Sequence, residues 1–249
     1  MRLKYGKLPF VASHKDFLFS KYRTPSPLPP RPPCYGRETA VADYGMLGND
    51  QVGDCAIAGP MHLAMIWTAA AGNPVTFTTQ SALAAYSAIA GYDPNNPETD
   101  VGCQLRDVLE YWRTTGFTDA AGNIHKIGAY LNIQPQDMQS IDEAMYLFAG
   151  VVSGFEVPAS MQDQFAADQP LTVVSGSPIE GGHCMPEAGL RDTYIPGLTW
   201  GAVAQITLPF HAAYCDEVWA VISQDELNGN GASPEGFDWA QLQADLAAL

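Results

Sequence analysis

The sequence predicts an α+β protein with two lobes, a helical lobe at about 38–125 and a β-rich lobe at about 126–225. The chain has 249 residues, 47% of them hydrophobic, which is enough to bury a large core. Long apolar and alanine-rich segments typical of helices fill the first half, and shorter apolar runs that indicate strands follow in the second. We therefore expect one domain over 38–249, preceded by an arm of residues 1–37.

The individual elements follow from hydrophobic spacing and from turn residues. In chain order we expect an extended lead-in at 38–46, a loop at 48–54, helices at about 55–71, 78–91 and 103–115, extended segments at 129–133 and 171–175, a short helix at 140–148, strands at 185–190, 198–208 and 217–223, and a C-terminal helix at about 237–248. Ser140 or Asp137 is expected to cap the short helix. Apolar residues at i, i+3, i+4 and i+7 predict the C-terminal helix.

Charge is distributed very unevenly along the chain. Residues 1–37 hold eight basic side chains and one acidic one, a charge of about +7. The other 212 residues hold 4 basic and 26 acidic side chains, a charge of about −22. Because an acidic body repels nucleic acid, binding of DNA or RNA by the body is excluded.

The arm is rich in proline between Pro25 and Pro33, which predicts a stiff, extended strap. Its positive charge is expected to hold it against acidic surface, either on its own body or on a partner subunit. The arm has no evident long helix, and we expect it to dock along the side of the lobes rather than to fill a cleft between them.

Cys55 stands between a polar, glycine-containing run, 48–54, and an apolar stretch that continues to Ala71. This position is a helix N-terminus, where unpaired backbone N–H groups and the positive end of the helix dipole stabilise a thiolate. Asp54 is expected to cap the helix, although its negative charge would oppose the thiolate.

His183 follows Gly181 and Gly182, and Thr199-Trp200-Gly201 begins sixteen residues further on. A cysteine that opens a helix and a distant histidine after glycines form the chain order of a Cys-His nucleophile pair. We therefore expect Cys55 and His183 to face each other across a cleft between the lobes.

The order and spacing of these motifs resemble those of the papain-like cysteine peptidases, including bacterial and phage types. Gly53-Asp54-Cys55 is similar to the family's Gly-Ser-Cys, and Gly182-His183 is similar to its Gly-His. The segment 198–201 is similar to its Asn-Ser-Trp-Gly. The resemblance covers roughly residues 40–225. It implies a papain-like two-lobe fold in which the helical lobe supplies the cysteine and the β-rich lobe the histidine.

The sequence departs from the family's pattern at the residue that orients the histidine, because Leu198 stands where the family has asparagine. Thr199 is a candidate through its hydroxyl, but alternation along a strand would turn it to the opposite face. Gln205, a backbone carbonyl or an ordered water are the alternatives. Trp200 is expected to shield whatever contact the histidine makes. For the oxyanion hole, Asn49 falls at the family's glutamine and Gln51 is the alternative amide donor.

Several other kinds of site are not expected. The Cys, His and carboxylate residues show neither zinc spacing nor an EF-hand loop, so we expect no metal and no cofactor. Five cysteines, an odd number, suit free thiols in a reducing compartment. We see neither a signal peptide nor a membrane span, which suggests a cytoplasmic or virion-associated protein. Among the other histidines, we expect His62 in the core, His125 in solvent and His211 at a surface. Cys103, Cys184 and Cys215 are expected to be small buried hydrophobic residues.

Two functions from different classes remain. The first is a thiol hydrolase that cleaves peptide or amide bonds in a peptide or protein substrate with Cys55 and His183. The alternative is a catalytically silent papain-fold module with a binding or structural role, as in a virus particle. Because both residues stand at matching positions, the hydrolase is favoured.

Overall fold

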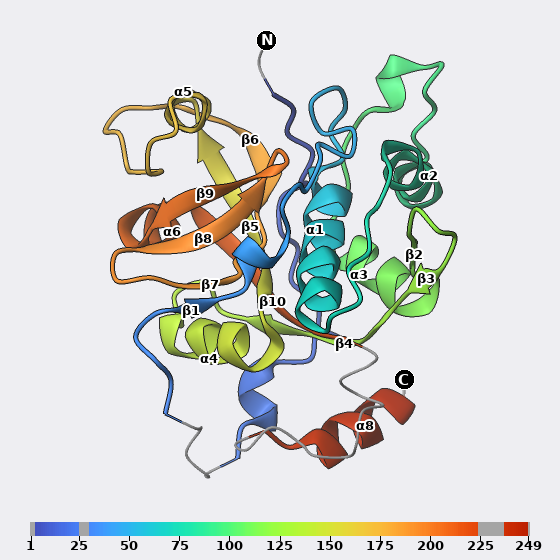
Figure 1. Ribbon diagram of the computed structural model, residues 1–249, viewed down its shortest axis with the longest axis vertical. Helices are drawn as coiled ribbons and strands as arrows, with labels where there is room; N and C mark the ends of the chain where they lie inside the picture. The colour runs from blue at the N-terminus through green and yellow to red at the C-terminus, as the bar shows by residue number, and fades with distance from the viewer. Residues whose placement is uncertain (1–2, 25–29, 224–236, 249) are drawn as a thin grey trace.

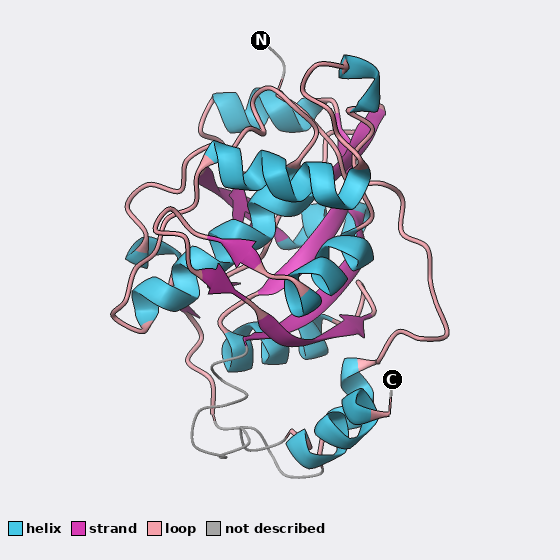
Figure 2. Cartoon of the chain, turned by 90° about the vertical axis from the view of Figure 1, so that its right-hand side faces the viewer, coloured by secondary structure: helices cyan, strands magenta, loops and turns pink. Residues whose placement is uncertain are grey.

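The computed structural model describes residues 3–24, 30–223 and 237–248. It is an α+β fold of two lobes, one mainly helical and the other built of strands with further helices packed around them (Figure 1). Viewed from the helical side, helices stand in front of the strands (Figure 2).

Helix α1, Cys55–Ala70, is the centre of the helical lobe. Every residue of it from Cys55 to Ile66 is buried, as expected for a helix that is apolar all round. Helices α2, Thr79–Ala90, and α3, Leu105–Thr114, pack against it. Helix α2 begins with a reciprocal capping box between Thr78 and Ser81.

The other lobe is built on a four-stranded antiparallel sheet in the order β4-β10-β5-β6. These strands are β4 at Ile127–Ile133, β5 at Val151–Pro158, β6 at Ile179–Cys184 and β10 at Cys215–Ser223. A hairpin of β8, Tyr194–Thr199, and β9, Ala202–Thr207, extends this lobe. Helix α4, Met138–Phe148, packs on the sheet and is capped by Asp137.

Short elements complete the described residues. They are the 3-10 turns η1, Phe19–Tyr22, η2, Glu38–Ala40, and η3, Pro97–Thr99; the strand pairs β1, Tyr35–Gly36, with β7, Gly189–Leu190, and β2, Phe117–Thr118, with β3, Ile124–His125; and the helices α5, Ser160–Ala166, α6, Leu208–Tyr214, and α8, Trp239–Ala247. None of the helices described is both long and apolar enough to cross a bilayer.

The predicted helices are confirmed to within about two residues at each end, but the strands are confirmed less well. The predicted strand 198–208 is in fact a hairpin that turns at Trp200 and Gly201, both with positive φ. The strand predicted at 185–190 is wrong, because β6 ends at Cys184 and only the two residues of β7 follow. Of the extended segment at 171–175, only Leu171 forms a bridge. Strand β5 was missed, since burial of nearly every residue leaves no alternation to detect.

The arm docks on its own body, and its middle part does so beside the sheet. Phe19 and Tyr22 of η1 are buried, and the Phe19 ring lies next to Phe148 and Phe237. Arg23 pairs with Glu143 at 2.8 Å, as the charge asymmetry predicted. Most of the proline-rich stretch, 25–29, lies outside the described residues.

The placement of the first part of the arm was predicted wrongly. Residues 3–10 do not run along the side of the lobes but descend between them, between α1 and the sheet (Figure 1). The backbone of this segment bonds to both lobes, to Gly182 on one side and to Cys103 on the other. Charge attraction predicts attachment but does not specify the site. The place where the arm binds is specified by complementarity between its backbone and the cleft.

Candidate active site

Cys55 is the first residue of α1 and is almost completely buried. The thiol lies against β6, where the backbone N–H of Cys184 favours its thiolate form, and against the arm, where the N–H groups of Gly6 and Lys7 act in the same direction. Burial outweighs these contacts and raises the pKa of the Cys55 thiol to about 12. The expected helix-terminal thiolate is therefore not the favoured form while the arm is in place.

Asp54 does not cap α1 as predicted. Its side chain makes no capping hydrogen bond, and both carboxyl oxygens are buried without a hydrogen-bond partner among the described residues. Burial raises the pKa of Asp54 well above its usual range. The expected opposition between Asp54 and a thiolate is present, because the charge of Asp54 also contributes to the raised pKa of Cys55.

His183 lies on β6 and is fully buried. Its Nε2 is 2.7 Å from Oγ1 of Thr199. The Trp200 ring stacks on the imidazole with a centroid separation of 4.4 Å. Nδ1, on the other side of the ring, has no hydrogen-bond partner in the part of the chain that the structure describes. Burial lowers the pKa of His183 to about 3, so the neutral imidazole is favoured.

Thr199, and not Leu198, is therefore the residue whose side chain contacts the imidazole. The expectation that it points to the opposite face is wrong, because Thr199 is the last residue of β8 and the chain turns at once. Trp200 has a φ of 45° and Gly201 one of 72°, so strand alternation does not extend past this point. Leu198 itself is buried in the core. A hydroxyl that accepts the Nε2–H leaves Nδ1 as the basic nitrogen.

The two amide candidates for the oxyanion hole differ sharply. Asn49 is buried, and its Nδ2 donates to the carbonyls of Val52 at 3.2 Å and Lys4 at 3.4 Å. Trp200 Nε1 donates to the same Lys4 carbonyl at 3.2 Å. Gln51 is exposed. The geometry favours Asn49, which already donates to a peptide carbonyl of the arm.

The arm crosses this site as an extended peptide. The N–H groups of Gly6 and Lys7 donate to the Gly182 carbonyl, next to His183, at 3.2 and 3.0 Å. On the helical lobe, Leu8 N–H donates to the Cys103 carbonyl at 3.0 Å, and Cys103 N–H donates to the Gly6 carbonyl at 2.9 Å. The pairing with Cys103 is parallel.

Glycines on both sides of the contact let the arm approach so closely. A Cβ on Gly6 would lie 1.7 Å from the Gly53 carbonyl oxygen, and one on Gly102 would lie 2.2 Å from the Gly6 carbonyl oxygen. A Cβ on Gly182 would lie 2.2 Å from the carbonyl oxygen of Lys7. Because no side chain fits at these positions, the glycines make the cleft complementary to this segment of the arm.

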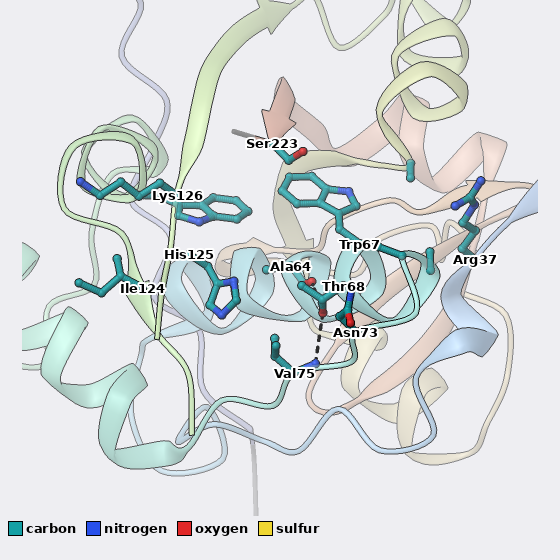
Figure 3. A pocket seen from close by; sticks show the side chains of 14 residues that line it. Arg37, Ala64, Trp67, Thr68, Asn73, Val75, Ile124, His125, Lys126 and Ser223 are labelled. Atoms are coloured by element: carbon teal, nitrogen blue, oxygen red, sulfur yellow. Dashed lines mark hydrogen bonds between the residues drawn. The ribbon is translucent and has the colours of Figure 1, made fainter. Parts of the chain in front are cut away.

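A cavity of about 540 Å³ lies elsewhere, towards the C-terminal end of α1 (Figure 3). Trp67, Trp112 and Lys126 are among its lining residues, and the two indole rings stack at 5.4 Å. Neither Cys55 nor His183 lines it. The candidate active site is thus not an open pocket, because the arm fills it.

The other histidines differ in part from expectation. His62 is a core residue, as predicted, and bonds to the Gly45 carbonyl. His125 was expected in solvent but pairs with Asp119 at 2.9 Å. His211 was expected at a surface, yet it is buried and its Nδ1 lies 2.8 Å from Glu187.

The cysteines and carboxylates offer no further site in the described ranges. All five cysteines are free thiols, and only Cys34 is exposed. Cys103, Cys184 and Cys215 are buried, as predicted. Across residues 3–24, 30–223 and 237–248, no group of three or more His, Cys, Asp or Glu side chains is placed to hold a metal ion.

No protein-family model and no curated protein matches the sequence. Solved structures do match. Xylellain, a cysteine protease from Xylella fastidiosa, superimposes with a TM-score of 0.68 over 89% of this chain and 98% of its own, at 16% identity. Procathepsin B S9 from Trypanosoma congolense gives 0.62 over 88% of this chain and 86% of its own, at 12% identity. The cysteine protease and lectin-like domains of Cwp84, from Clostridium difficile, give 0.59 over 89% of this chain and 57% of theirs, at 12% identity. At these identities the likeness establishes the papain-like fold.

Proposed function

We propose that this chain, with its papain-like fold, is a thiol hydrolase of peptide or amide bonds that is held latent by its own N-terminus. Cys55 is the nucleophile, His183 is the base and Thr199 orients the imidazole. The observation that carries the proposal is the environment of His183. Its Nε2 contacts Thr199 and its ring is covered by Trp200, while Nδ1 has no hydrogen-bond partner among the described residues.

The chemistry follows from these positions once the arm has left the cleft. His183 Nδ1 takes the thiol proton of Cys55, and the sulfur attacks the carbonyl carbon of the substrate. The Asn49 amide and the backbone N–H of Cys55 donate to the oxyanion that forms. The imidazolium then protonates the leaving amine, and water hydrolyses the thioester to release the acid and the free thiol.

Latency follows from the same contacts. The arm excludes water from the cleft, and the resulting pKa values of about 12 for Cys55 and about 3 for His183 favour an uncharged pair. Departure of the arm admits water and substrate, which removes most of the desolvation that disfavours the thiolate.

The experiment is controlled release of the arm from folded protein. A recognition site for a sequence-specific protease is inserted between Ala12 and Ser13, near Val11, which is 59% exposed. After cleavage and gel filtration, the protein should hydrolyse fluorogenic peptide amides, and the uncut protein should be nearly inactive. The matched control carries Cys55→Ala and the same cut. Activity equal to this control after release would refute the proposal.

A catalytically silent module is the second candidate, favoured by one observation. Cys55 and His183 are both fully enclosed, and burial disfavours the charged form of each. In a silent module, an alkylating reagent at neutral pH would label Cys55 of the released protein no faster than an ordinary thiol.

A further inference from the structure

Lys7 of the arm is unusual because its side chain has no exposed surface. Lysine is almost never fully buried unless its charge is paired. Its Nζ is 2.5 Å from Asp216 Oδ2 and 3.5 Å from Glu217 Oε2. Both carboxylates lie at the start of β10, in the body of the protein. The cleft therefore receives the lysine in a site of opposite charge.

The pocket is also shaped for the aliphatic stem of a lysine. A Cβ on Gly154, in β5, would lie 2.2 Å from Lys7 Cε, so the missing side chain of this glycine leaves room for the stem. Glu217 is almost completely buried, and Trp219 Nε1 donates to its Oε1 at 2.8 Å, which fixes the carboxylate. Glycine, acid and indole belong to the sheet, so the pocket does not depend on the arm for its construction.

The pocket opens beside the nucleophile. The thiol of Cys55 lies against the backbone N–H groups of Gly6 and Lys7. A peptide that takes the place of the arm in this cleft therefore has a side chain at the mouth of the pocket close to the reacting sulfur. An empty pocket leaves the buried Glu217 carboxylate without its cation, which is unfavourable.

We propose that the pocket formed by Gly154, Asp216 and Glu217 is a specificity site that selects a lysine side chain in the substrate, and that Lys7 occupies it in the latent protein. As a statement about substrates, the proposal rests on the proposed hydrolase function. As a statement about binding, it does not. The two parts are therefore tested separately.

Binding is measured on the Cys55→Ala protein after the arm has been cut and removed. The probes are fluorescent peptides of residues 1–12, unaltered or with Lys7→Met. A third probe with Lys4→Met loses the same charge at an exposed position of the same segment and is the control. Anisotropy titration should show the Lys7→Met peptide binding about 100-fold more weakly than the control, or worse. Equal affinities would overturn the proposal.

A protein variant locates the effect in the pocket. Glu217→Gln removes the charge but keeps an oxygen that can accept from Trp219. The affinities of the unaltered and Lys7→Met peptides for this variant should differ by clearly less than their affinities for the parent protein do. An undiminished difference would show that Glu217 does not select the cation, contrary to the proposal.

Cleavage is measured on the cut protein that retains Cys55, with a peptide-amide library that places lysine or methionine at each position in turn. Lysine should be preferred at one position, and an active enzyme without any such preference would refute the specificity site. Lysine-selective binding without any hydrolysis would instead refute the hydrolase and leave the pocket established.

Discussion

Replacement of Gly6 by valine should open the cleft without altering the catalytic residues. A Cβ at this position would lie 1.7 Å from the Gly53 carbonyl oxygen, which is too close for any side chain. Because Gly53 belongs to the turn before α1, relief by movement of the body would disturb a buried helix, whereas the arm can simply leave. Lys4→Val is the matched control, since it places the same side chain at an exposed position of the same segment.

The size of the effect follows from the contacts that the segment loses. Four backbone hydrogen bonds join Gly6, Lys7 and Leu8 to Gly182 and Cys103. At about 0.5–1.5 kcal/mol net for each bond, they hold the arm closed by about 2–6 kcal/mol. Even the lower value corresponds to a change of about 30-fold in the population of the open cleft. The Lys7 ion pair adds to this difference.

The assay is the rate at which a small alkylating reagent labels Cys55. Cys34 is exposed and would react first, so every protein carries Cys34→Ser. Peptide mapping assigns the label to Cys55, and the other three cysteines are buried. Gly6→Val should label at least about 30-fold faster than Lys4→Val. Equal rates, with both proteins folded by circular dichroism, would show that the arm does not control access to Cys55.

Three further predictions concern single side chains. In the arm-released enzyme, Asn49→Ala should lower kcat by about 100- to 1000-fold, while Gln51→Ala should change it little; equal losses would refute the choice of Asn49 for the oxyanion. Thr199→Ala should lower kcat by roughly tenfold, with partial recovery in Thr199→Ser because the hydroxyl returns; no recovery would point to packing instead. His211→Ala should destabilise the protein by about 3–5 kcal/mol in urea unfolding, because Glu187 would remain buried without its cationic partner. Burial alone would lower the pKa of His211, but the attraction of Glu187 and hydrogen bonds raise it to about 11. The stability from this pair is therefore fully present below about pH 6.5 and is lost as pH rises towards 11, and a difference between parent and His211→Ala that grows with pH would contradict this sign.

The parts of the candidate site that could be predicted from sequence are those with a local signature. Cys55 is marked by the change from polar turn to apolar helix, and His183 by the two glycines before it. Thr199 was a candidate, but its direction depends on a turn at Trp200 that no local pattern announces. Strand β5 carries no alternation because it is buried on both faces. The predicted helices were placed well because their apolar residues recur at helical spacing or, in α1, fill every face, and α2 and α4 also have side-chain caps.

The location of the arm could not be predicted from net charge. Attraction between about +7 and about −22, by counting, predicts contact somewhere on an acidic surface. The position is selected by shape, through Gly6 against Gly53 and Gly102, and by one buried ion pair at Lys7. These partners are separated by about 50 to 200 residues in sequence, so only the folded chain brings them together.

In the proposed latent hydrolase, the second attachment of the arm makes residues 3–10 a tethered competitor of the substrate. Phe19 and Tyr22 are buried, and η1 packs on β4 and α8 rather than in the cleft, so we expect it to stay in place when residues 3–10 leave. A displaced segment therefore stays within reach of the cleft, at an effective concentration of the order of millimolar. A free peptide must compete with it continuously, so substrate alone opens the cleft only in part. A single cut near Val11 removes the tether. The same contacts then hold residues 1–12 only as a separate fragment, which dissociates on dilution. Cleavage of one peptide bond in an exposed stretch thus converts a reversible opening of the cleft into a permanent one.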